Sequence, residues 1–397
     1  MVIFASYAFA ALAGLLAIPV AMFCLEIGAA IALPRRERPA RAGNEPRRRV
    51  AVLVPAHNES TGLRPTIDDI RAQLLAGDRL LVVADNCSDD TAAAAAAAGA
   101  EVVVRHDPVR IGKGYALDWG LRHLAADPPE IVIIVDADCR LADHAIDRLA
   151  TACADTRRPV QALYLMNAPD RSAVNYQVAE FAWRVKNWVR PLGLGALRLP
   201  CQLVGTGMAF PWDVIRSADL ASGEIVEDLK LGLDLALAGS PPVFCPSAIV
   251  TSYFPASIEG AARQRQRWEH GHIAIILSVA PRLILSAIAR GNLGLLALAL
   301  DVAIPPLIVL GLLSTAVLAV AGVAALVGLS SGALMVSAAS FGAFMLAVVL
   351  AWLTHGRDVL PPRALLSIGP YVFGKLRLYR RLLSDGFVSH WIRTDRK

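Results

Sequence analysis

Two aspartates one residue apart are the strongest sign of chemistry in this sequence. In VDADC (135–139), Asp136 and Asp138 follow an apolar, β-branched run that is typical of a buried strand. Carboxylate oxygens at the end of a strand can hold a hard divalent cation, and such a cation can neutralise a diphosphate. A surface turn is the alternative, since aspartate is common in turns. A second acidic loop, one strand earlier, favours the metal site.

That second loop is ADNCSDDT (84–91), which also follows an apolar run. Asp85 lies where the expected strand ends, and its carboxylate can accept hydrogen bonds from a base or a ribose. Ser88 or Asp89 can instead cap the N-terminus of the alanine-rich helix that follows. The two interpretations are compatible, because Asp85 can bind a ligand while Asp89 caps the helix.

Two further segments place charged groups beside glycines or at a helix start. In RIGKGYAL (110–117), Lys113 lies between two glycines, which resembles a phosphate cradle but lacks the complete P-loop pattern. A solvated loop lysine is the alternative. In EIVEDLKLGLDLALAG (224–239), Glu227 and Asp228 open an expected helix whose leucines mark its buried side. These acids can favour the helix dipole, or one of them can act as a general base toward a hydroxyl group.

The hexapeptide RQRQRW (263–268) combines three arginines with a tryptophan. Guanidinium groups suit phosphate oxygens, and an indole can stack on a sugar ring or anchor a helix at a membrane interface. A nucleic-acid stripe is the competing interpretation. It is disfavoured because the net charge is only +5 and the other basic runs lie beside apolar blocks, where they indicate membrane topology. The residues therefore favour a phosphate site close to a membrane, and the family resemblance given below implies a diphosphate and acceptor clamp with no nucleic-acid partner.

Apolar runs that alternate with helical patterns must position these groups. Four short runs, RVAVLVPA, RLLVVAD, EVVVR and EIVIIVD, end in polar residues and are separated by stretches of helical character. This alternation predicts an α/β domain with a mainly parallel sheet that helices cover on both faces. In such sheets ligands bind at the carboxyl ends of the strands. The sequence places four candidate ligand-binding side chains there: His57, Glu59, Asp85 and Asp136.

The composition indicates a membrane protein. Hydrophobic residues make up 55% of the 397 residues and the mean hydropathy is +0.50, which is too high for a soluble protein of this size. Residues 1–33 carry a single charge, Glu26, and residues 293–353 also carry a single charge, Asp301. The first block is long enough to span a bilayer once and the second twice. The cysteines show no metal-binding spacing, and a reducing cytosol suits them.

These features predict an order of parts with the catalytic chemistry inside the cell. The parts are an N-terminal transmembrane helix (1–33), a basic linker (34–49), a cytoplasmic α/β domain (50–258), amphipathic interfacial helices (259–291), two transmembrane helices (292–355) and a basic interfacial C-terminal segment (356–397). Arginines beside the apolar blocks mark the cytoplasmic side, so we expect the N-terminus outside and the α/β domain inside. We expect a multi-pass protein of a bacterial-type inner membrane, with basic segments that contact anionic membrane lipid.

Six segments in this order resemble the motif series of the family 2 membrane glycosyltransferases, a group that includes cellulose, chitin and hyaluronan synthases. They are VPAHNE, ADNCSDD, VDADC, VGTGMAF, EIVEDLKLG and QRQRW, and residues 264–268 match the family's QxxRW pattern. The resemblance implies a GT-A-type nucleotide-sugar-binding domain flanked by α-helical transmembrane segments. The sequence departs from the family at Ala84, which precedes Asp85 where many members have two acids. It also has fewer expected spans than the larger processive synthases.

The resemblance implies a role for each candidate residue. Asp228 would be the catalytic base, with Glu227 beside it, and Asp138 and Asp136 would bind Mg²⁺ or Mn²⁺. The nucleotide sugar would be bound by His57, Glu59, Asp85, Lys113, Asp136, Gln264 and Arg267. The acceptor would be bound by Gly205, Thr206, Gly207 and Trp268.

The implied reaction is a single displacement at the anomeric carbon, with inversion of its configuration. A UDP-sugar donor and a glycan acceptor would give a β-linkage, in exopolysaccharide or cell-surface glycan synthesis. The alternatives are transfer of one sugar to a membrane lipid and a non-catalytic, nucleotide-binding scaffold of a secretion complex. A dinucleotide dehydrogenase is excluded because no GxGxxG follows the first strand. Two modes of action stay open. The protein can add one or a few sugars, or it can synthesise a polymer as a homo-oligomer or with a secretion partner.

Overall fold

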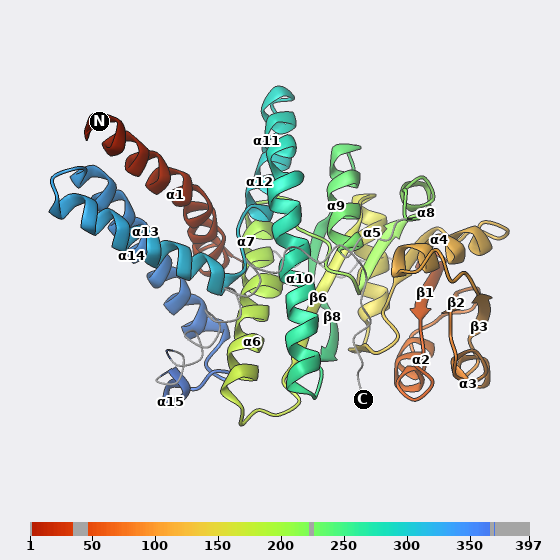
Figure 1. Ribbon diagram of the computed structural model, residues 1–397. Coiled ribbons are helices and arrows are strands. Elements are labelled where there is room, and N and C mark those ends of the chain that lie inside the picture. Colours follow the sequence, from red (N-terminus) through yellow and green to blue (C-terminus); the bar gives the residue numbers. More distant parts are fainter. Residues whose placement is uncertain (1, 35–46, 222–225, 366–368, 370–397) are drawn as a thin grey trace. The chain divides into compact units, whose positions relative to one another are not determined.

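The computed structural model describes residues 2–34, 47–221, 226–365 and 369. These residues form two compact units (Figure 1). The sheet unit takes up the described parts of 47–169 and 200–271, and the helical unit takes up those of 2–34, 170–199 and 272–369. Most of the expected basic linker (34–49) and most of the basic C-terminal segment (356–397) lie outside the described residues.

The sheet unit is built on one mixed eight-stranded sheet with the order β3-β2-β1-β4-β7-β6-β8-β5. β1 (Val50–Ala56) lies between β2 (Arg79–Asp85) and β4 (Ile131–Ile134) and is parallel to both, and β3 (Glu101–Arg105) is parallel to β2. β7 (Met208–Pro211) runs antiparallel between β4 and β6 (Val160–Asn167). β8 (Val243–Tyr253) pairs in parallel with β6 and antiparallel with β5 (Arg140–Leu141). The predicted α/β fold with a mainly parallel sheet is confirmed.

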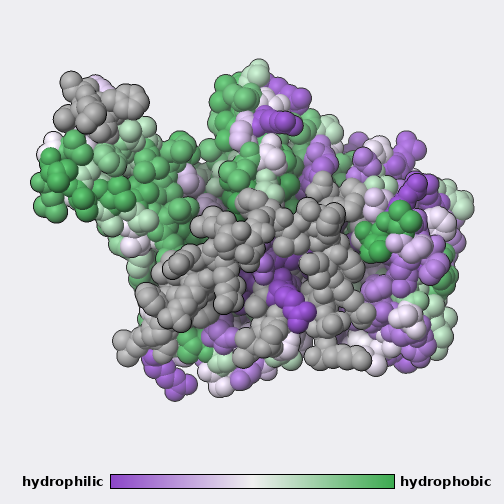
Figure 2. Space-filling model, viewed as in Figure 1, coloured by the Kyte–Doolittle hydropathy of each residue, from purple (hydrophilic) through white to green (hydrophobic). Residues whose placement is uncertain are grey.

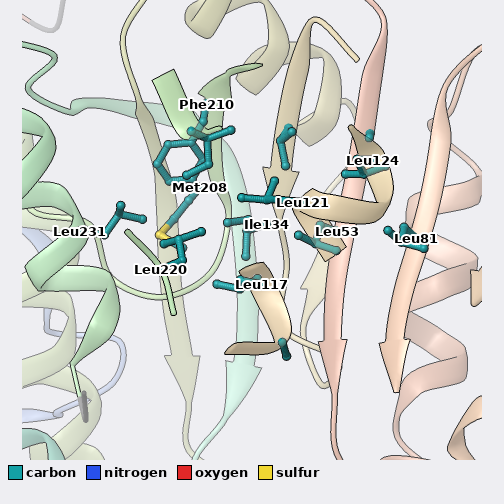
Figure 3. Close-up of a cluster of buried hydrophobic side chains, with 14 of the residues drawn as sticks. Leu53, Leu81, Leu117, Leu121, Leu124, Ile134, Met208, Phe210, Leu220 and Leu231 are labelled. Carbon is teal, nitrogen blue, oxygen red and sulfur yellow. The ribbon is translucent and has the colours of Figure 1, made fainter. Parts of the chain in front are cut away.

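Helices connect the strands and bury the sheet. They are α2 (Leu63–Arg71), α3 (Thr91–Ala97), α4 (Lys113–Leu124), α5 (Ala145–Thr156), α8 (Trp212–Ile215) and α9 (Glu227–Leu237). Successive strand residues point to opposite faces, so Leu53, Leu81 and Ile134 share one face and pack against Leu117 and Leu121 of α4 (Figure 3). α9 adds leucines to the same core. This packing fixes the first residues of α4 and α9, both of which are charged, relative to the strand ends.

Three helices of the helical unit are long and apolar enough to cross a membrane. They are α1 (Val2–Ala32, candidate span Ser6–Ala32), α13 (Leu307–Leu326) and α14 (Ser331–His355). α1 packs against both α13 and α14, and hydrophobic residues cover the visible surface of these helices at the left of the view (Figure 2). These three helices are compatible with a membrane protein.

Further apolar helices precede α13 in the chain. α10 (Ile258–Ser278) and α11 (Ala280–Ala289) form a pair bent by 41° between Arg263–Ser278 and Ala280–Ala289, which would be a fourth crossing if the pair is one span. α12 (Leu293–Val302) is too short to cross a membrane alone. The sequence predicted interfacial helices at 259–291, where the bent pair lies. It predicted two transmembrane helices at 292–355, a range that also contains the separate helix α12.

Residues 170–199 are grouped differently from the sequence-based expectation. The sequence placed them in the middle of one α/β domain (50–258), whereas the structure groups α6 (Val174–Arg184), the π-helical turn η1 (Val185–Val189) and α7 (Arg190–Ala196) with the apolar helices. α7 packs directly against α1. α15 (Pro362–Leu365) also belongs to the helical unit. The sheet unit is therefore discontinuous in sequence between β6 and β7.

A buried ion cluster explains why this inserted segment belongs with the apolar helices. Arg190 Nε lies 2.6 Å from Glu26 Oε2 in α1, and Arg190 Nη2 donates to the Asp301 carbonyl oxygen at 2.8 Å and to the Asp301 carboxylate in α12. Glu26, Arg190 and Asp301 are 0%, 4% and 3% exposed. Because an unpaired buried charge is strongly destabilising, these three segments need one another. The single charge in each apolar block thus has its partner in α7.

Replacement of Gly120 by alanine is expected to destabilise the sheet unit. A Cβ at Gly120 in α4 would lie 2.4 Å from Leu53 Cδ1 and 3.0 Å from a Val83 methyl group, so the helix must move away from the sheet. Overpacking of this kind costs about 1–3 kcal/mol of unfolding free energy. Thermal unfolding of the purified protein in detergent measures the effect.

Gly195→Ala provides the matched control for this prediction. Gly195 lies in α7 and a Cβ there would meet no heavy atom within 4 Å. The same substitution is expected to leave stability unchanged or to raise it by about 0.5–1 kcal/mol, because alanine is the better helix former. Equal melting temperatures for wild type and Gly120→Ala would contradict the close packing of α4 on β1.

Candidate functional site

The parallel strands bring three predicted site residues to one edge of the sheet. β1 pairs in parallel with β2 on one side and with β4 on the other, so the carboxyl ends of these strands share an edge. His57, Asp85 and Asp136 lie at or just after those ends. His57 Nδ1 lies 2.7 Å from the Asp85 carbonyl oxygen, which ties the first two loops together. The carboxyl edge of the sheet, which the sequence predicted as the ligand-binding edge, is therefore where these candidate residues lie together.

Lys113 lies at the centre of the acidic groups. Its Nζ is 2.5 Å from Asp136 Oδ1 and 3.9 Å from Glu227 Oε1, and it donates to the Gly205 carbonyl oxygen at 2.5 Å. Burial disfavours the ammonium charge, but the carboxylates of Asp136, Glu227 and Asp228 more than offset this effect and raise the pKa of Lys113. Lys113 is a fixed cation in this site, which differs from the solvated loop lysine of the alternative interpretation.

The loop 204–207 is held against the end of β4 by two polar side chains. Thr206 Oγ1 accepts a hydrogen bond from Asp136 N at 3.0 Å. Gln161 Nε2 donates to the Thr206 carbonyl oxygen at 2.9 Å, and Gln161 Oε1 accepts from Val204 N at 2.9 Å. Gly207 has φ +64°, and a Cβ there would lie 2.7 Å from an alanine side chain of β6, so this position requires glycine. The predicted acceptor loop is thus rigid and adjoins Asp136.

Glu227 and Asp228 open α9, as the sequence predicted. The Asp228 carboxylate reaches the same loop, because a Cβ at Gly205 would lie 3.1 Å from Asp228 Oδ2. Burial and then the charge of Asp228 raise the pKa of Glu227 to about 7. The Glu227 side chain is only 16% exposed. Near neutral pH, Glu227 is therefore partly protonated, which lessens the repulsion among neighbouring carboxylates.

One group of side chains has the composition of a divalent-cation site. Asp136, Asp138 and Cys139 each offer a ligand atom within 4.8 Å of the others. Burial raises the pKa of Cys139 to about 12, so its thiol stays protonated and the two carboxylates are the candidate ligands. Carboxylate oxygens suit Mg²⁺ or Mn²⁺. The residues present therefore fit the expected cation, which would share Asp136 with Lys113.

α10 contributes the three residues of the predicted QxxRW pattern. Gln264 is 1% exposed, and its Nε2 makes no hydrogen bond to any residue that the structure describes. The Arg267 guanidinium lies within electrostatic range of Asp136, Glu227 and Asp228. Trp268 is half-buried. Arg267 is thus positioned as a second cation beside the acidic groups around Lys113.

Glu59 and Asp89 organise the local backbone. The Glu59 backbone N donates to Thr91 Oγ1 at 2.8 Å, and a Cβ at Gly62 would lie 3.1 Å from Glu59 Oε2, at the start of α2. Asp89 Oδ1 accepts from Thr91 N at 3.1 Å at the first residue of α3. The N-cap residue of α3 is Asp90, so the prediction that Ser88 or Asp89 is the N-cap is wrong, although Asp89 still accepts a hydrogen bond at the start of the helix.

Two buried polar residues that the sequence analysis did not select support the site. Arg105, at the end of β3, is 6% exposed and its Nη1 lies 2.6 Å from Asp85 Oδ1. Gln161, in β6, is 2% exposed and holds the loop 204–207. Each is a polar residue beside an apolar run: Arg105 follows VVV, and Gln161 lies within VQALYLM. Because buried polar groups need partners, this feature was a usable signal, although the sequence does not name the partner.

Comparisons with known proteins identify the family and the fold of the chain. The model of the family described as Glycosyltransferase like family 2 matches residues 46–271. No curated protein matches the chain in sequence. A solved mannosyltransferase from Pyrobaculum calidifontis, in complex with GDP-Man and Mn²⁺, is 18% identical, with 87% of this chain and 99% of that chain covered and a TM-score of 0.50. For glucosyl-3-phosphoglycerate synthase from Mycobacterium tuberculosis, in complex with Mn²⁺ and UDP-glucose, these values are 26%, 61%, 80% and 0.39.

Replacement of Glu227 by glutamine is expected to stabilise the protein at neutral and alkaline pH. The folded protein binds the Glu227 proton more tightly than the unfolded chain, because folding raises the pKa from 4.5 to about 7. The wild type therefore loses stability as the pH rises through this window, and the loss persists above it. Glutamine does not ionise, so the variant lacks this loss, which is on the order of 3 kcal/mol.

Thermal unfolding without added divalent cations, at pH values of about 5 and about 8, tests this prediction. The melting temperature of Glu227→Gln should exceed that of wild type by more at the higher pH. Glu130→Gln is the control, because Glu130 is exposed and pairs with Arg48 far from the acidic groups. A stability difference that is the same at both pH values would show that the pKa of Glu227 is not raised.

Proposed function

The chain belongs to the glycosyltransferase like family 2 and is a glycosyltransferase, and we propose that it is an inverting membrane enzyme that uses a nucleotide sugar, with UDP as the nucleotide. The acceptor we propose is a glycan, and the product is a β-linkage in an exopolysaccharide or a cell-surface glycan. The three apolar helices support a place in a membrane. The membrane we propose is a bacterial-type inner membrane, with the sheet unit in the cytoplasm. We also propose that the basic segments 34–49 and 356–397 contact anionic membrane lipid. The enzyme would act as a homo-oligomer or with a secretion partner.

One observation carries the proposal: a single ammonium group contacts Asp136, the loop that contains Gly205, and Glu227, the neighbour of the proposed base Asp228. Lys113 Nζ reaches Asp136, the Gly205 carbonyl oxygen and the Glu227 carboxylate within 3.9 Å. A single displacement needs a leaving diphosphate, an attacking hydroxyl and a base within one small volume. Asp136, Gly205 and the Glu227–Asp228 pair supply those three positions.

The proposed chemistry follows from these positions. Asp228 takes the proton of the acceptor hydroxyl while the hydroxyl oxygen bonds to the anomeric carbon. The bond from that carbon to the diphosphate oxygen breaks, and the configuration inverts from α to β. Arg267 and Lys113 stabilise the charge that develops on the departing diphosphate. Asp136 and Asp138 would hold Mg²⁺ or Mn²⁺, which supplies further neutralisation of the diphosphate when bound.

The remaining predicted residues take places around this centre. His57, Glu59 and Asp85 would bind the nucleoside, and Gln264 would bind the diphosphate with Arg267. Thr206, Gly207 and Trp268 would line the acceptor side with Gly205. Transfer to a membrane lipid, or a silent scaffold in a secretion complex, are the alternatives that the following experiment separates.

Asp228→Asn is expected to abolish sugar transfer while it preserves donor binding. Loss of a general base typically lowers kcat by about 10²–10⁴-fold. The assay measures nucleoside diphosphate release by the detergent-purified protein from a panel of UDP- and GDP-sugars, with and without membrane lipid extract. Activity only with lipid extract would indicate a lipid acceptor, and silence with every donor despite UDP binding would favour the scaffold.

Asp234→Asn is the matched control, since Asp234 lies in the same helix and pairs with Lys230 at the surface. This variant should retain the wild-type rate. Release that survives in Asp228→Asn at the rate of Asp234→Asn would remove Asp228 from the role of base.

Removal of divalent cations by a chelator is expected to stop nucleotide release, and Mn²⁺ or Mg²⁺ should restore it. Asp138→Asn should raise the metal concentration needed for half-maximal activity by more than about tenfold, because it removes one of two carboxylate ligands. Asp143→Asn, an exposed aspartate in a nearby loop, should leave the metal requirement unchanged. A metal titration that is identical for the two variants would exclude Asp138 as a ligand.

A further inference from the structure

Arg105 is held on four sides at the end of β3. Its Nη1 lies 2.6 Å from Asp85 Oδ1, and its Nη2 donates to the Arg110 carbonyl oxygen at 2.8 Å and lies 3.2 Å from Asp107 Oδ2. The guanidinium carbon lies 5.5 Å from the centre of the Tyr115 ring, in a cation–π contact. Arg105 is only 6% exposed, so its guanidinium is buried among these partners.

Asn86 closes a ring of side chains around Asp85. Asn86 Nδ2 donates to Asp85 Oδ1 at 3.2 Å, and Asn86 Oδ1 accepts from Asp107 N at 2.8 Å. Asp107 in turn contacts Arg105, which returns to Asp85. The ring joins the loop after β2 to the loop that leads to Lys113. A rotation of the Asp85 carboxylate would break several of these contacts at once.

The two oxygens of Asp85 are therefore unequal. Oδ1 already accepts hydrogen bonds from Arg105 Nη1 and Asn86 Nδ2. Oδ2 accepts none from the residues that the structure describes, and the Asp85 side chain keeps 9% exposure. Asp85 thus offers a ligand one fixed acceptor atom at the carboxyl edge of the sheet.

The bases of UDP-sugars and GDP-sugars differ in the hydrogen-bond donors that they present to such an acceptor. Uracil presents a single ring N–H on its pairing edge, between two carbonyl groups. Guanine presents an N–H and an amino group side by side, which together suit both oxygens of one carboxylate. With Oδ1 engaged, guanine would leave one donor buried without a partner, and such a group costs binding free energy.

We propose that Arg105 determines nucleotide specificity: by occupying one oxygen of Asp85, it restricts the site to a base with a single N–H donor and so selects uridine over guanosine nucleotides. This inference rests on the proposed function, in which Asp85 binds the base. Arg105 touches no substrate and acts through Asp85. It is therefore a positioning residue, and its effect is measured by the ratio of the GDP and UDP dissociation constants.

Titration calorimetry on the full-length, detergent-purified protein with Mn²⁺ tests the proposal, with UDP and GDP as the two probes. The wild type should bind UDP at least about tenfold more tightly than GDP, the value of one well-made hydrogen bond to a charged group. Arg105→Met removes the charged donor from Oδ1 and leaves only the longer hydrogen bond from Asn86 Nδ2 there. The variant should therefore reduce the ratio of GDP to UDP dissociation constants by about tenfold. Arg105→Lys keeps a positive charge but lacks the planar guanidinium with its several N–H groups. This variant should give a ratio of GDP to UDP dissociation constants between those of wild type and Arg105→Met.

Arg79→Met is the matched control. Arg79 begins β2 at the opposite end of the sheet and pairs with Glu101 of β3, so the variant loses an ion pair between the same two strands. Its UDP-to-GDP preference should equal that of wild type. Thermal unfolding of each variant identifies any that do not fold. If Arg105→Met does not fold, the ratios measured for wild type and Arg105→Lys test the proposal.

Two results would overturn the inference. The first is a wild type that binds GDP as tightly as UDP. The second is a ratio that stays at the wild-type value in Arg105→Met and Arg105→Lys while both nucleotides bind more weakly, which would make Arg105 a structural residue only. Failure of the proposed function looks different, because the wild type would then bind neither nucleotide.

Discussion

The balance of charge around one ammonium group is the constraint on which the candidate site depends. Asp136 comes from a strand end, while Glu227 and Asp228 come from the start of α9, and the core beneath α4 and α9 holds them together. Like charges at this spacing repel, and Lys113 offsets that repulsion through direct contacts. Because the same ammonium also donates to the Gly205 carbonyl oxygen, it links Asp136 and Glu227 to the loop 204–207.

Local patterns were sufficient to predict the part of the fold that carries the site. β1, β2 and β4 are short apolar runs buried on both faces, and each ends in polar residues, so their identity and their functional edge follow from the sequence. The antiparallel β7 and the order of β6 and β8 did not follow. Pairing between distant strands leaves no periodic signal in either strand, and only the folded sheet defines it.

The sequence identified the acids of the site but not the groups that orient them. Asp85 and Arg105 are 20 residues apart, Gln161 and Val204 are 43 apart, and Glu26 and Arg190 are 164 apart. Each pair is created by tertiary packing, so residue type suggests that a partner exists without naming it. The grouping of residues 170–199 with the apolar helices was missed for the same reason, since its cause is the contact of Arg190 with two distant acids.

The insertion between β6 and β7 has a consequence for biosynthesis. The ribosome delivers β1 to β6, then the segment 170–199, and only afterwards the strands that complete the sheet. Arg190 precedes Asp301 by 111 residues, so the nascent chain carries an incomplete ion cluster until α12 emerges. A fragment limited to residues 50–258 would retain Arg190 and lose both of its acidic partners. The sheet unit and the helical unit are therefore interleaved along the chain, and neither is encoded by one continuous segment.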